Sequence, residues 1–419
     1  MFDFYKLNNG VRVMLVPVPG VQSVALGVYV RAGTRDETEE NNGVAHFLEH
    51  VVFKGTKNYS TPESLMVLEA TGGYKNAGTA QEYTMYEAKL PSDKLDLGLS
   101  VLSDIVLYPL LDSEALENEK KTILEEIKRR SDQSEELVME SFYHDRYQDL
   151  GLKLKTLGSV DSIKSLSKGQ FDTYHQSHYT SANILVCITG KFDNLNLDKY
   201  FGHLPKSVAP IWPKPEILPG PQVFITERPE DQQIQMALGG EAFGMSDPRR
   251  FALTVLFRIL DFGLSGRLFK ATRIDRNLVY NVHAGADLDC DHGSWLTVAG
   301  VSPTNLRELI DVILKELKLL KELRVSDKEL SDAKEKVRVP LLFSLESPLS
   351  QMEWYAQQGL FRESEILTHD QAIQKIMAVT AQDIQNVARD LFTTENLYLS
   401  LVGPIKESQK EVLLKILKV

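Results

Sequence analysis

Two histidines and a glutamate lie close together in the stretch GVAHFLEHVVFKGT. His46 and His50 are four positions apart, so on a helix both imidazoles project from one face and can bind one metal ion. Glu49 lies beside them, where a carboxylate that is not a ligand can take a proton from water. Neutral imidazoles suit zinc, and the order His-x-x-Glu-His inverts the better known His-Glu-x-x-His zinc motif. Cobalt or manganese could also use such ligands. The alternative is two ordinary histidines of a core helix.

A catalytic zinc normally has three protein ligands, so a third is needed. The charge-rich residues 113–132 predict a long helix, and Glu119 and Glu126 fall on the same stripe as its apolar residues. Unpaired carboxylates are costly to bury, so a metal ion or a histidine partner would explain them. Arg130 lies on the same stripe, which leaves open that this face is simply exposed. Spacing alone does not decide between these interpretations.

Several further elements must position these groups. Residues 11–33 predict two strands joined by a turn near Pro19-Gly20, and a helix carrying the histidine pair follows from about Asn42.

His175 and His178 are a second possible metal pair by spacing, or structural histidines near a helix end. Residues 203–221 contain six prolines and predict an extended linker.

The two halves of the chain resemble each other. YTSANILVCITG at 179–190 matches FTTENLYLSLVG at 392–403, and VQSVALGV at 21–28 matches QQIQMALG at 232–239. Both pairs are separated by about 210 residues, which favours a duplicated α/β domain over chance similarity of strands. The predicted organisation is a domain at 1–203, a Pro-rich linker at 204–221 and a homologous domain at 222–419.

Composition narrows the class of protein. The chain has 419 residues, 43% of them hydrophobic and 25% charged, with a formal net charge of −11. This is the composition of a globular protein, and the negative charge argues against nucleic acid or an anionic membrane as partner. No run of 18 apolar residues predicts a membrane span. The N-terminal stretch has neither signal-peptide nor transit-peptide character, and only two cysteines occur, so we expect a cytoplasmic protein.

With HFLEH, FKGT and ENEKKTILEE, the chain resembles the inverzincin zinc metallopeptidases, the family of pitrilysin, insulysin and mitochondrial processing peptidase. The resemblance implies an α+β fold of two homologous α/β domains, each a mainly antiparallel sheet with helices packed on it. It implies one zinc per chain, bound by His46, His50 and Glu126, the last lying 76 positions after His50. It makes Glu49 the general base and gives Glu119, seven positions before Glu126, a supporting catalytic role.

The resemblance extends to groups that would bind substrate. GGYKNAGTAQEYTMY looks like the family's edge strand, to which the substrate adds as a further strand, and Asn76 and Ala77 are the matching positions. SGRLFKATRIDRNLVY looks like a second family motif, in which Arg273 and Tyr280 match residues that contact the substrate or its developing oxyanion. Without the family, the first stretch is a loop and a strand, and the second offers a surface arginine and a strand tyrosine.

The implied activity is hydrolysis of peptides or unfolded protein segments by a zinc endopeptidase, inside a closed chamber built by a homodimer. Two alternatives remain. The chain could be a catalytic subunit that needs a distinct homologous partner, or a non-catalytic core or scaffold subunit of a larger assembly.

Overall fold

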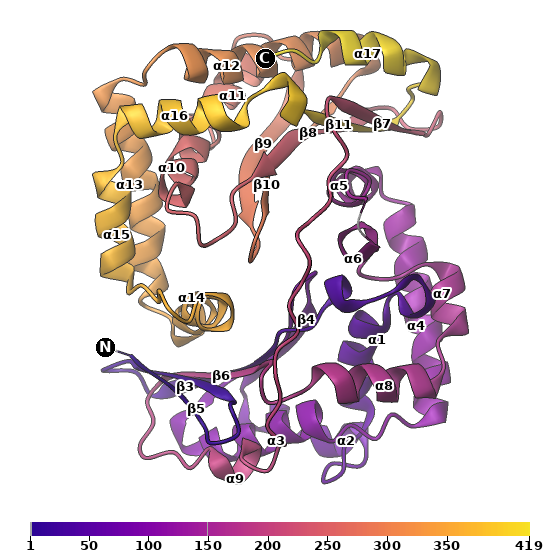
Figure 1. Cartoon of the computed structure of the whole chain (residues 1–419), viewed down its shortest axis with the longest axis vertical. Coiled ribbons are helices and arrows are strands. Elements are labelled where there is room, and N and C mark those ends of the chain that lie inside the picture. The colour runs from indigo at the N-terminus through magenta and orange to yellow at the C-terminus, as the bar shows by residue number, and fades with distance from the viewer. Residues whose placement is uncertain (1, 149) are drawn as a thin grey trace. The chain divides into compact units, whose positions relative to one another are not determined.

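The computed structural model describes residues 2–148 and 150–419, which form two compact units (Figure 1). The first unit comprises residues 2–128, Leu150–Pro213 and Phe343–Thr368. The second comprises residues 129–148, Lys214–Leu342 and His369–Val419. Each unit has one open sheet with helices on both faces, which confirms the predicted α+β architecture. Within the described residues, no helix combines the length and apolar character needed to cross a bilayer.

The first unit is built on a six-stranded sheet in the order β1-β2-β6-β3-β5-β4. The β2–β6 pair is parallel and the other pairs are antiparallel. Its strands are β1 (Asp3–Lys6), β2 (Arg12–Pro17), β3 (Ser23–Val30), β4 (Tyr74–Thr79), β5 (Thr84–Pro91) and β6 (Ile184–Gly190). Its helices are α1 (Val44–Val51), α2 (Pro62–Leu65), α3 (Leu95–Leu107), most of α4 (Ser113–Ser131), α6 (Leu150–Lys153), α7 (Val160–Ser165), α8 (Lys168–His178), α9 (Asp198–Phe201) and α14 (Pro348–Phe361).

Strand β6 shows why this sheet is covered on both faces. Its sequence ILVCITG is apolar almost throughout and every residue is buried, as expected for a strand between two packed layers. Ile184, Val186 and Ile188 join the large core that includes α1, α3 and α8. Leu185 and Cys187 point to the other face, where α14 covers them.

The second unit repeats this arrangement with a five-stranded sheet in the order β7-β11-β8-β10-β9. Its strands are β7 (Gln222–Glu227), β8 (Ile234–Ala242), β9 (Val279–Leu288), β10 (Gly293–Val301) and β11 (Tyr398–Gly403). Its helices are α5 (Ser134–His144), α10 (Arg250–Leu260), α11 (Arg267–Phe269), most of α13 (Asp327–Ser344), α12 (Leu306–Glu322), α15 (His369–Ala378), α16 (Ala381–Leu391) and α17 (Lys410–Ile416).

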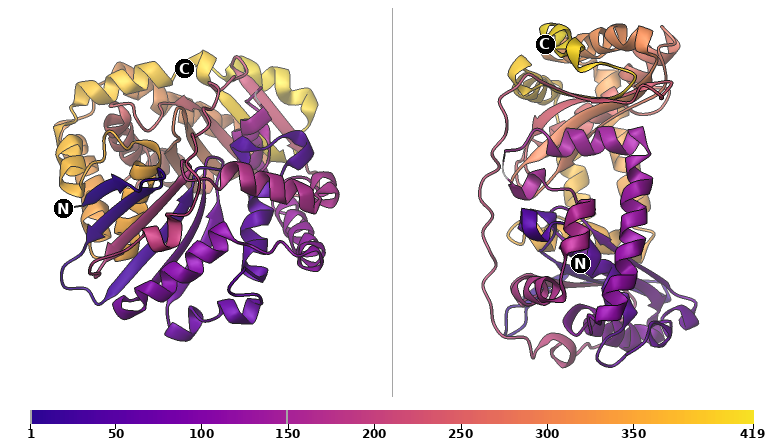
Figure 2. Two further views of the ribbon diagram at one scale, coloured as in Figure 1. Left: turned by 60° about the horizontal axis from the view of Figure 1, so that its bottom comes forward. Right: turned by 90° about the vertical axis from the view of Figure 1, so that its right-hand side faces the viewer.

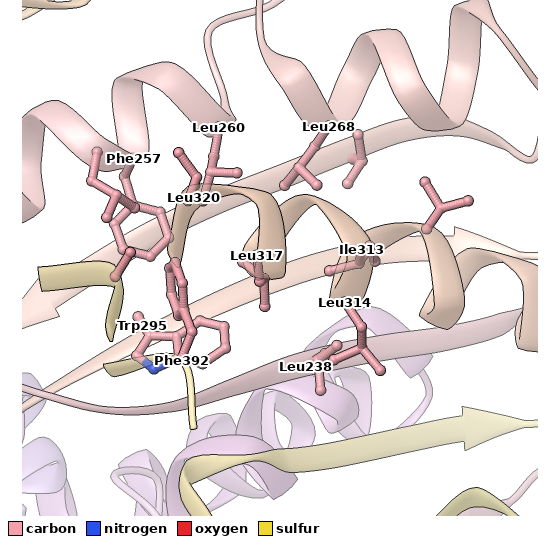
Figure 3. Close-up of a cluster of buried hydrophobic side chains, with 14 of the residues drawn as sticks. Leu238, Phe257, Leu260, Leu268, Trp295, Ile313, Leu314, Leu317, Leu320 and Phe392 are labelled. Atoms are coloured by element: carbon pink, nitrogen blue, oxygen red, sulfur yellow. The ribbon is translucent and has the colours of Figure 1, made fainter. Parts of the chain in front are cut away.

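The core of the second unit lies between its sheet and helices α10, α12 and α16 (Figure 3). Helix α12 contributes leucine and isoleucine at three- and four-residue spacing, including Ile313, Leu317 and Leu320, which form its buried stripe. Trp295 of β10 packs edge-on against Phe392, with ring centroids 4.9 Å apart. Such an aromatic pair stabilises a core by roughly 0.5–1.5 kcal/mol beyond its buried area.

Equivalent strands of the two sheets support the duplication inferred from the sequence. The strands β6 and β11, which carry the first repeated stretch, each pair in parallel with one neighbour and antiparallel with another. The antiparallel neighbours, β3 and β8, carry the second repeated stretch. The repeated sequences therefore occupy the same places in two sheets whose strand order agrees apart from the additional edge strand β1 of the first sheet.

Each unit is completed by a helix from the other half of the chain. Helix α14 covers one face of the first sheet with Met352, Tyr355 and Ala356, among others. Helix α5 covers the corresponding face of the second sheet with Val138 and Phe142. The sequence-based limits 1–203 and 222–419 do not include this exchange, because the periodicity of a helix shows its apolar face but not the sheet that the face covers.

The Pro-rich segment 203–221 is largely irregular and extended, visible as a long thread in the right-hand view of Figure 2. Part of it is fixed to the first unit through Trp212. The indole Nε1 donates a hydrogen bond to Asp36 Oδ1 at 2.8 Å, and the guanidinium of Arg31 lies 3.6 Å from the ring centroid. Arg35 lies over the same ring and donates to the carbonyl of Pro213 at 2.9 Å. The part of the segment around Trp212 is thus packed against the first unit and is not a free linker.

Candidate metal centre

Helix α1 carries the histidine pair, and its start is set by Gly43. This residue has φ of 91°, in the left-handed region that favours glycine. A Cβ atom here would also lie 2.7 Å from Cδ1 of Ile163 and 2.9 Å from the carbonyl oxygen of Leu157. A side chain at this position would therefore displace the start of the helix.

Helix α4 carries the two predicted glutamates. Asp112 precedes it and accepts hydrogen bonds from the backbone N–H groups of Glu114 and Ala115 at 2.9 and 3.1 Å, which satisfies two donors of the first turn. The buried stripe of the helix includes Glu119, whereas Glu126 is half-buried. The buried position of Glu119 agrees with the stripe expected from the sequence.

The structure brings His46, His50 and Glu126 together. One ligand atom from each of the three lies within 4.8 Å of the others. Glu126 Oε2 lies 3.8 Å from His46 Nε2 and 4.0 Å from His50 Nε2. With bonds of about 2.0–2.1 Å, ligand atoms of a tetrahedral zinc lie roughly 3.3 Å apart, so the two distances to Glu126 need to close by less than about 1 Å. Two imidazoles and a carboxylate are also the donor chemistry of catalytic zinc sites. The residues present therefore fit a zinc ion.

Glu119 fixes the orientation of one imidazole. Its Oε1 lies 2.9 Å from Nδ1 of His50, which turns Nε2 of that ring towards Glu126. Its Oε2 pairs with Nζ of Lys54 at 2.7 Å. The hydrogen bond to His50, with help from Lys54, lowers the pKa of Glu119 to about 2, although burial opposes this shift. The same hydrogen bond raises the pKa of His50.

Glu49 projects from the same helix and is partly buried. Burial raises the pKa of its carboxyl, while His50 and a hydrogen bond from Thr79 act in the opposite direction. The Oγ1 of Thr79 lies 3.4 Å from Glu49 Oε2. A partly desolvated carboxylate beside two imidazoles has the surroundings expected of a general base.

The stretch that was predicted to bind substrate forms β4, at the edge of the first sheet. Asn76 and Ala77 both lie on it, and Ala77 pairs with Tyr86 of β5. Asn76 Nδ2 donates to Oε1 of the buried Glu87 at 3.3 Å. The other edge of β4 has no strand beside it in the described sheet, so its backbone groups can pair with an extended peptide.

Arg273 and Tyr280 lie in the second unit and contact each other. The Arg273 guanidinium is 4.9 Å from the Tyr280 ring centroid, and its Nη1 donates to the carbonyl of Val279 at 3.2 Å. Arg273 lies in a π-helical turn, Lys270–Ile274, and Tyr280 on β9 has a relative exposure of 71%. The two side chains thus form one pair of donors, with Tyr280 exposed and Arg273 half-buried.

His175 and His178 lie in the last turn of α8. His175 Nε2 hydrogen bonds with the carbonyl of Val106 at 2.7 Å, and burial lowers the pKa of both rings. Neither belongs to a group of described residues that could hold a metal ion. The structural interpretation of this pair is therefore favoured.

Comparison with known proteins shows the family of the chain. A family model described as Insulinase (Peptidase family M16) matches residues 12–160, and one described as Peptidase M16 inactive domain matches residues 165–337. An uncharacterized zinc protease of Bacillus subtilis, YmxG, is 32% identical over 408 residues, covering 96% of this chain and 98% of that protein. The chain belongs to peptidase family M16. The beta subunit of the mitochondrial-processing peptidase of Saccharomyces cerevisiae is 28% identical over 398 residues, covering 90% of this chain and 86% of the subunit.

Solved structures support the same M16 fold. A protease from Helicobacter pylori superimposes with a TM-score of 0.82 at 20% identity, covering 96% of this chain and 99% of that one. A Pseudomonas fluorescens protein described as a peptidase M16 inactive domain superimposes with a TM-score of 0.85 at 17% identity, covering 97% and 98%. The family membership and the names of the relatives support a metallopeptidase.

Two side chains beside the site, Lys54 and Thr79, were not predicted from the sequence to take part in it. Lys54 lies in the FKGT stretch and Thr79 in the edge-strand motif. A pattern does not show which carboxylate a lysine or a threonine meets. The structure pairs Lys54 with Glu119 and Thr79 with Glu49.

The contact between Glu119 and His50 leads to a first prediction. Glu119→Gln should lower zinc affinity by about 10–100-fold, because partners that orient a metal ligand typically contribute this much. Affinity is measured by competition with a chromogenic chelator. Glu117→Gln on the same helix is the matched control, since Glu117 is exposed and pairs only with Lys120 in the described contacts. Equal affinities of the two variants would contradict the assigned role of Glu119.

Proposed function

We propose that this chain is a zinc-dependent endopeptidase that hydrolyses peptides or unfolded protein segments inside a closed chamber. The observation that supports this most is the convergence of His46 Nε2, His50 Nε2 and Glu126 Oε2, with Glu49 on the same helix. We assign the zinc chemistry to the domain at 1–203 and a substrate clamp to the domain at 222–419.

Each residue has a distinct part in the proposed reaction. His46, His50 and Glu126 would hold one zinc ion per chain, which supplies Lewis acidity at the scissile carbonyl when bound. Glu49 takes a proton from the attacking water and returns it to the leaving amine. Glu119 holds the His50 ring by its Nδ1 atom.

The substrate is proposed to bind as an added strand along β4, near Asn76 and Ala77. Backbone hydrogen bonding of this kind reads little of the side-chain sequence, which suits an enzyme for varied or unfolded peptides. We propose a homodimer in which Arg273 and Tyr280 of a second copy contact the substrate or stabilise its developing oxyanion. The low cysteine content supports a cytoplasmic location.

The test is to incubate the purified chain with a mixed peptide library and to map the cuts by mass spectrometry. We expect internal cuts by the chain alone, and no cuts after treatment with a chelator. Activity that appears only with a homologous second protein would favour the heterodimer alternative. Stoichiometric zinc without any cleavage, alone or with such a partner, would favour a scaffold subunit and contradict the proposal.

A further inference from the structure

Glu37 lies upstream of the metal-binding helix and its side chain is buried, with a relative exposure of 5%. Its carboxyl oxygens accept three hydrogen bonds from the segment that begins α1. Oε2 accepts from the backbone N–H of Gly43 at 2.8 Å and from Asn42 Nδ2 at 2.9 Å. Oε1 accepts from the backbone N–H of Ala45 at 2.8 Å. One carboxyl thus binds Asn42, Gly43 and Ala45, three of the four residues from Asn42 to Ala45.

The start of α1 needs such an acceptor. The first N–H groups of a helix have no partner within the helix, and a side chain at the N-cap usually supplies one. Here the N-cap is Gly43, which has no side chain. Glu37 takes over this function from outside the helix. Burial raises the pKa of Glu37 to about 8 against the effect of its three donors, and the carboxyl offers acceptor lone pairs in either protonation state.

The anchored turn leads directly into the metal site. Ala45, whose N–H binds Glu37, immediately precedes His46. Helix α1 has only eight residues, and a helix of this length is not stable by itself in water. Packing of its buried face against the core and the contacts at its ends therefore together place the helix and its imidazoles. Asn42 also connects the start of α1 to a second segment, because its Nδ2 donates a hydrogen bond to the carbonyl of Lys155 at 2.8 Å.

We propose that Glu37 is a positioning residue of the metal centre, which holds the first turn of α1 and thereby directs the His46 imidazole towards Glu126. This inference rests on the proposed function in one respect, namely that the centre binds zinc. It assigns Glu37 no contact with zinc or with substrate.

The test compares the metal-binding properties of Glu37→Gln and Glu37→Ala with those of the wild-type chain. Zinc affinity is measured by chelator competition, and the ligand geometry is followed by the visible absorption of the cobalt-substituted protein. Glu37→Ala leaves three donors without their acceptor and should weaken zinc binding about 10–100-fold, the range typical for partners of metal ligands. Glu37→Gln keeps one oxygen acceptor, so we expect an intermediate loss. Both variants should change the cobalt spectrum.

Asp104 provides matched control variants. It is 3% exposed and also accepts three hydrogen bonds, from Thr56 Oγ1 and from the backbone N–H and Nδ2 of Asn58, and none of these donors belongs to α1. Asp104→Asn and Asp104→Ala should lower thermal stability to a similar extent and leave the zinc affinity and the cobalt spectrum unchanged.

The outcomes separate this inference from the proposed function. A wild-type chain that binds no zinc would contradict the proposed function and this inference with it. Normal zinc binding by the wild type, with unchanged affinity and spectrum in folded Glu37→Gln, would overturn this inference alone, even if Glu37→Ala does not fold. The inference is also overturned if the Asp104 variants lose as much zinc affinity as the Glu37 variants.

Discussion

Replacing Glu49 by glutamine is expected to slow peptide hydrolysis by about 10²–10⁴-fold, the contribution usual for a general acid–base group. Glutamine has nearly the same size and can keep the contact with Thr79 Oγ1, which lies 3.4 Å from Glu49 Oε2 in the wild type. It cannot take a proton from water at neutral pH. The rate is measured on one peptide from the library, with enzyme and zinc concentrations determined independently.

The control for this variant is its own metal content. Glu49 does not belong to the ligand set His46, His50 and Glu126, so Glu49→Gln should bind zinc with the affinity of the wild type. If the variant is inactive and has also lost zinc, the missing metal explains the loss of rate and the assigned role of Glu49 as a residue outside the ligand set is contradicted. A variant with wild-type rate would show that Glu49 is not the base.

Replacing Glu126 by alanine is expected to weaken zinc binding by about 10²–10³-fold, because four-ligand structural zinc sites bind with roughly 10–16 kcal/mol, or about 3 kcal/mol per ligand. Peptide hydrolysis should fall at least as far at limiting zinc. Zinc affinity by chelator competition and metal content after dialysis measure the effect.

The neighbouring Glu125 provides the matched control. It lies on the same helix one position away, is exposed, and points off the buried stripe. Glu125→Ala removes the same carboxylate from α4 with the same effect on helix propensity, and should keep wild-type zinc affinity and rate. If Glu125→Ala and Glu126→Ala lose zinc equally, the third ligand has been assigned to the wrong group.

Much of the candidate site could be predicted because its chemistry follows helical spacing. His46 and His50 share a helix face by their separation of four positions, and Glu119 follows the buried stripe of a long helix by its separation from apolar residues. Helical spacing does not give the distance between α1, which carries the histidines, and α4, which carries the glutamates. The assignment of Glu126 from sequence therefore depended on family resemblance, and its approach to both imidazoles became visible only in the folded chain.

The anchoring carboxyl of Glu37 illustrates what sequence could not supply. It lies in RDETEENN, where several acidic residues look alike, and nothing in the local pattern marks the one that is buried. Its role depends on a loop that turns back onto the start of α1, a contact set by tertiary packing. The positions of helices α5 and α14 could not be predicted for a similar reason. Each covers a sheet from the other half of the chain, and sequence periodicity does not show which sheet a helix covers.

The central claim is that one zinc ion at His46, His50 and Glu126 makes this chain a peptidase, and a titration tests it most directly. The metal-free chain is titrated with zinc while cleavage of a library peptide and bound zinc are followed together. The rate should rise from near zero in proportion to bound zinc and level off at about one ion per chain, as a mononuclear catalytic site requires. Full cleavage by the metal-free chain, or saturation with zinc without cleavage, would contradict the claim.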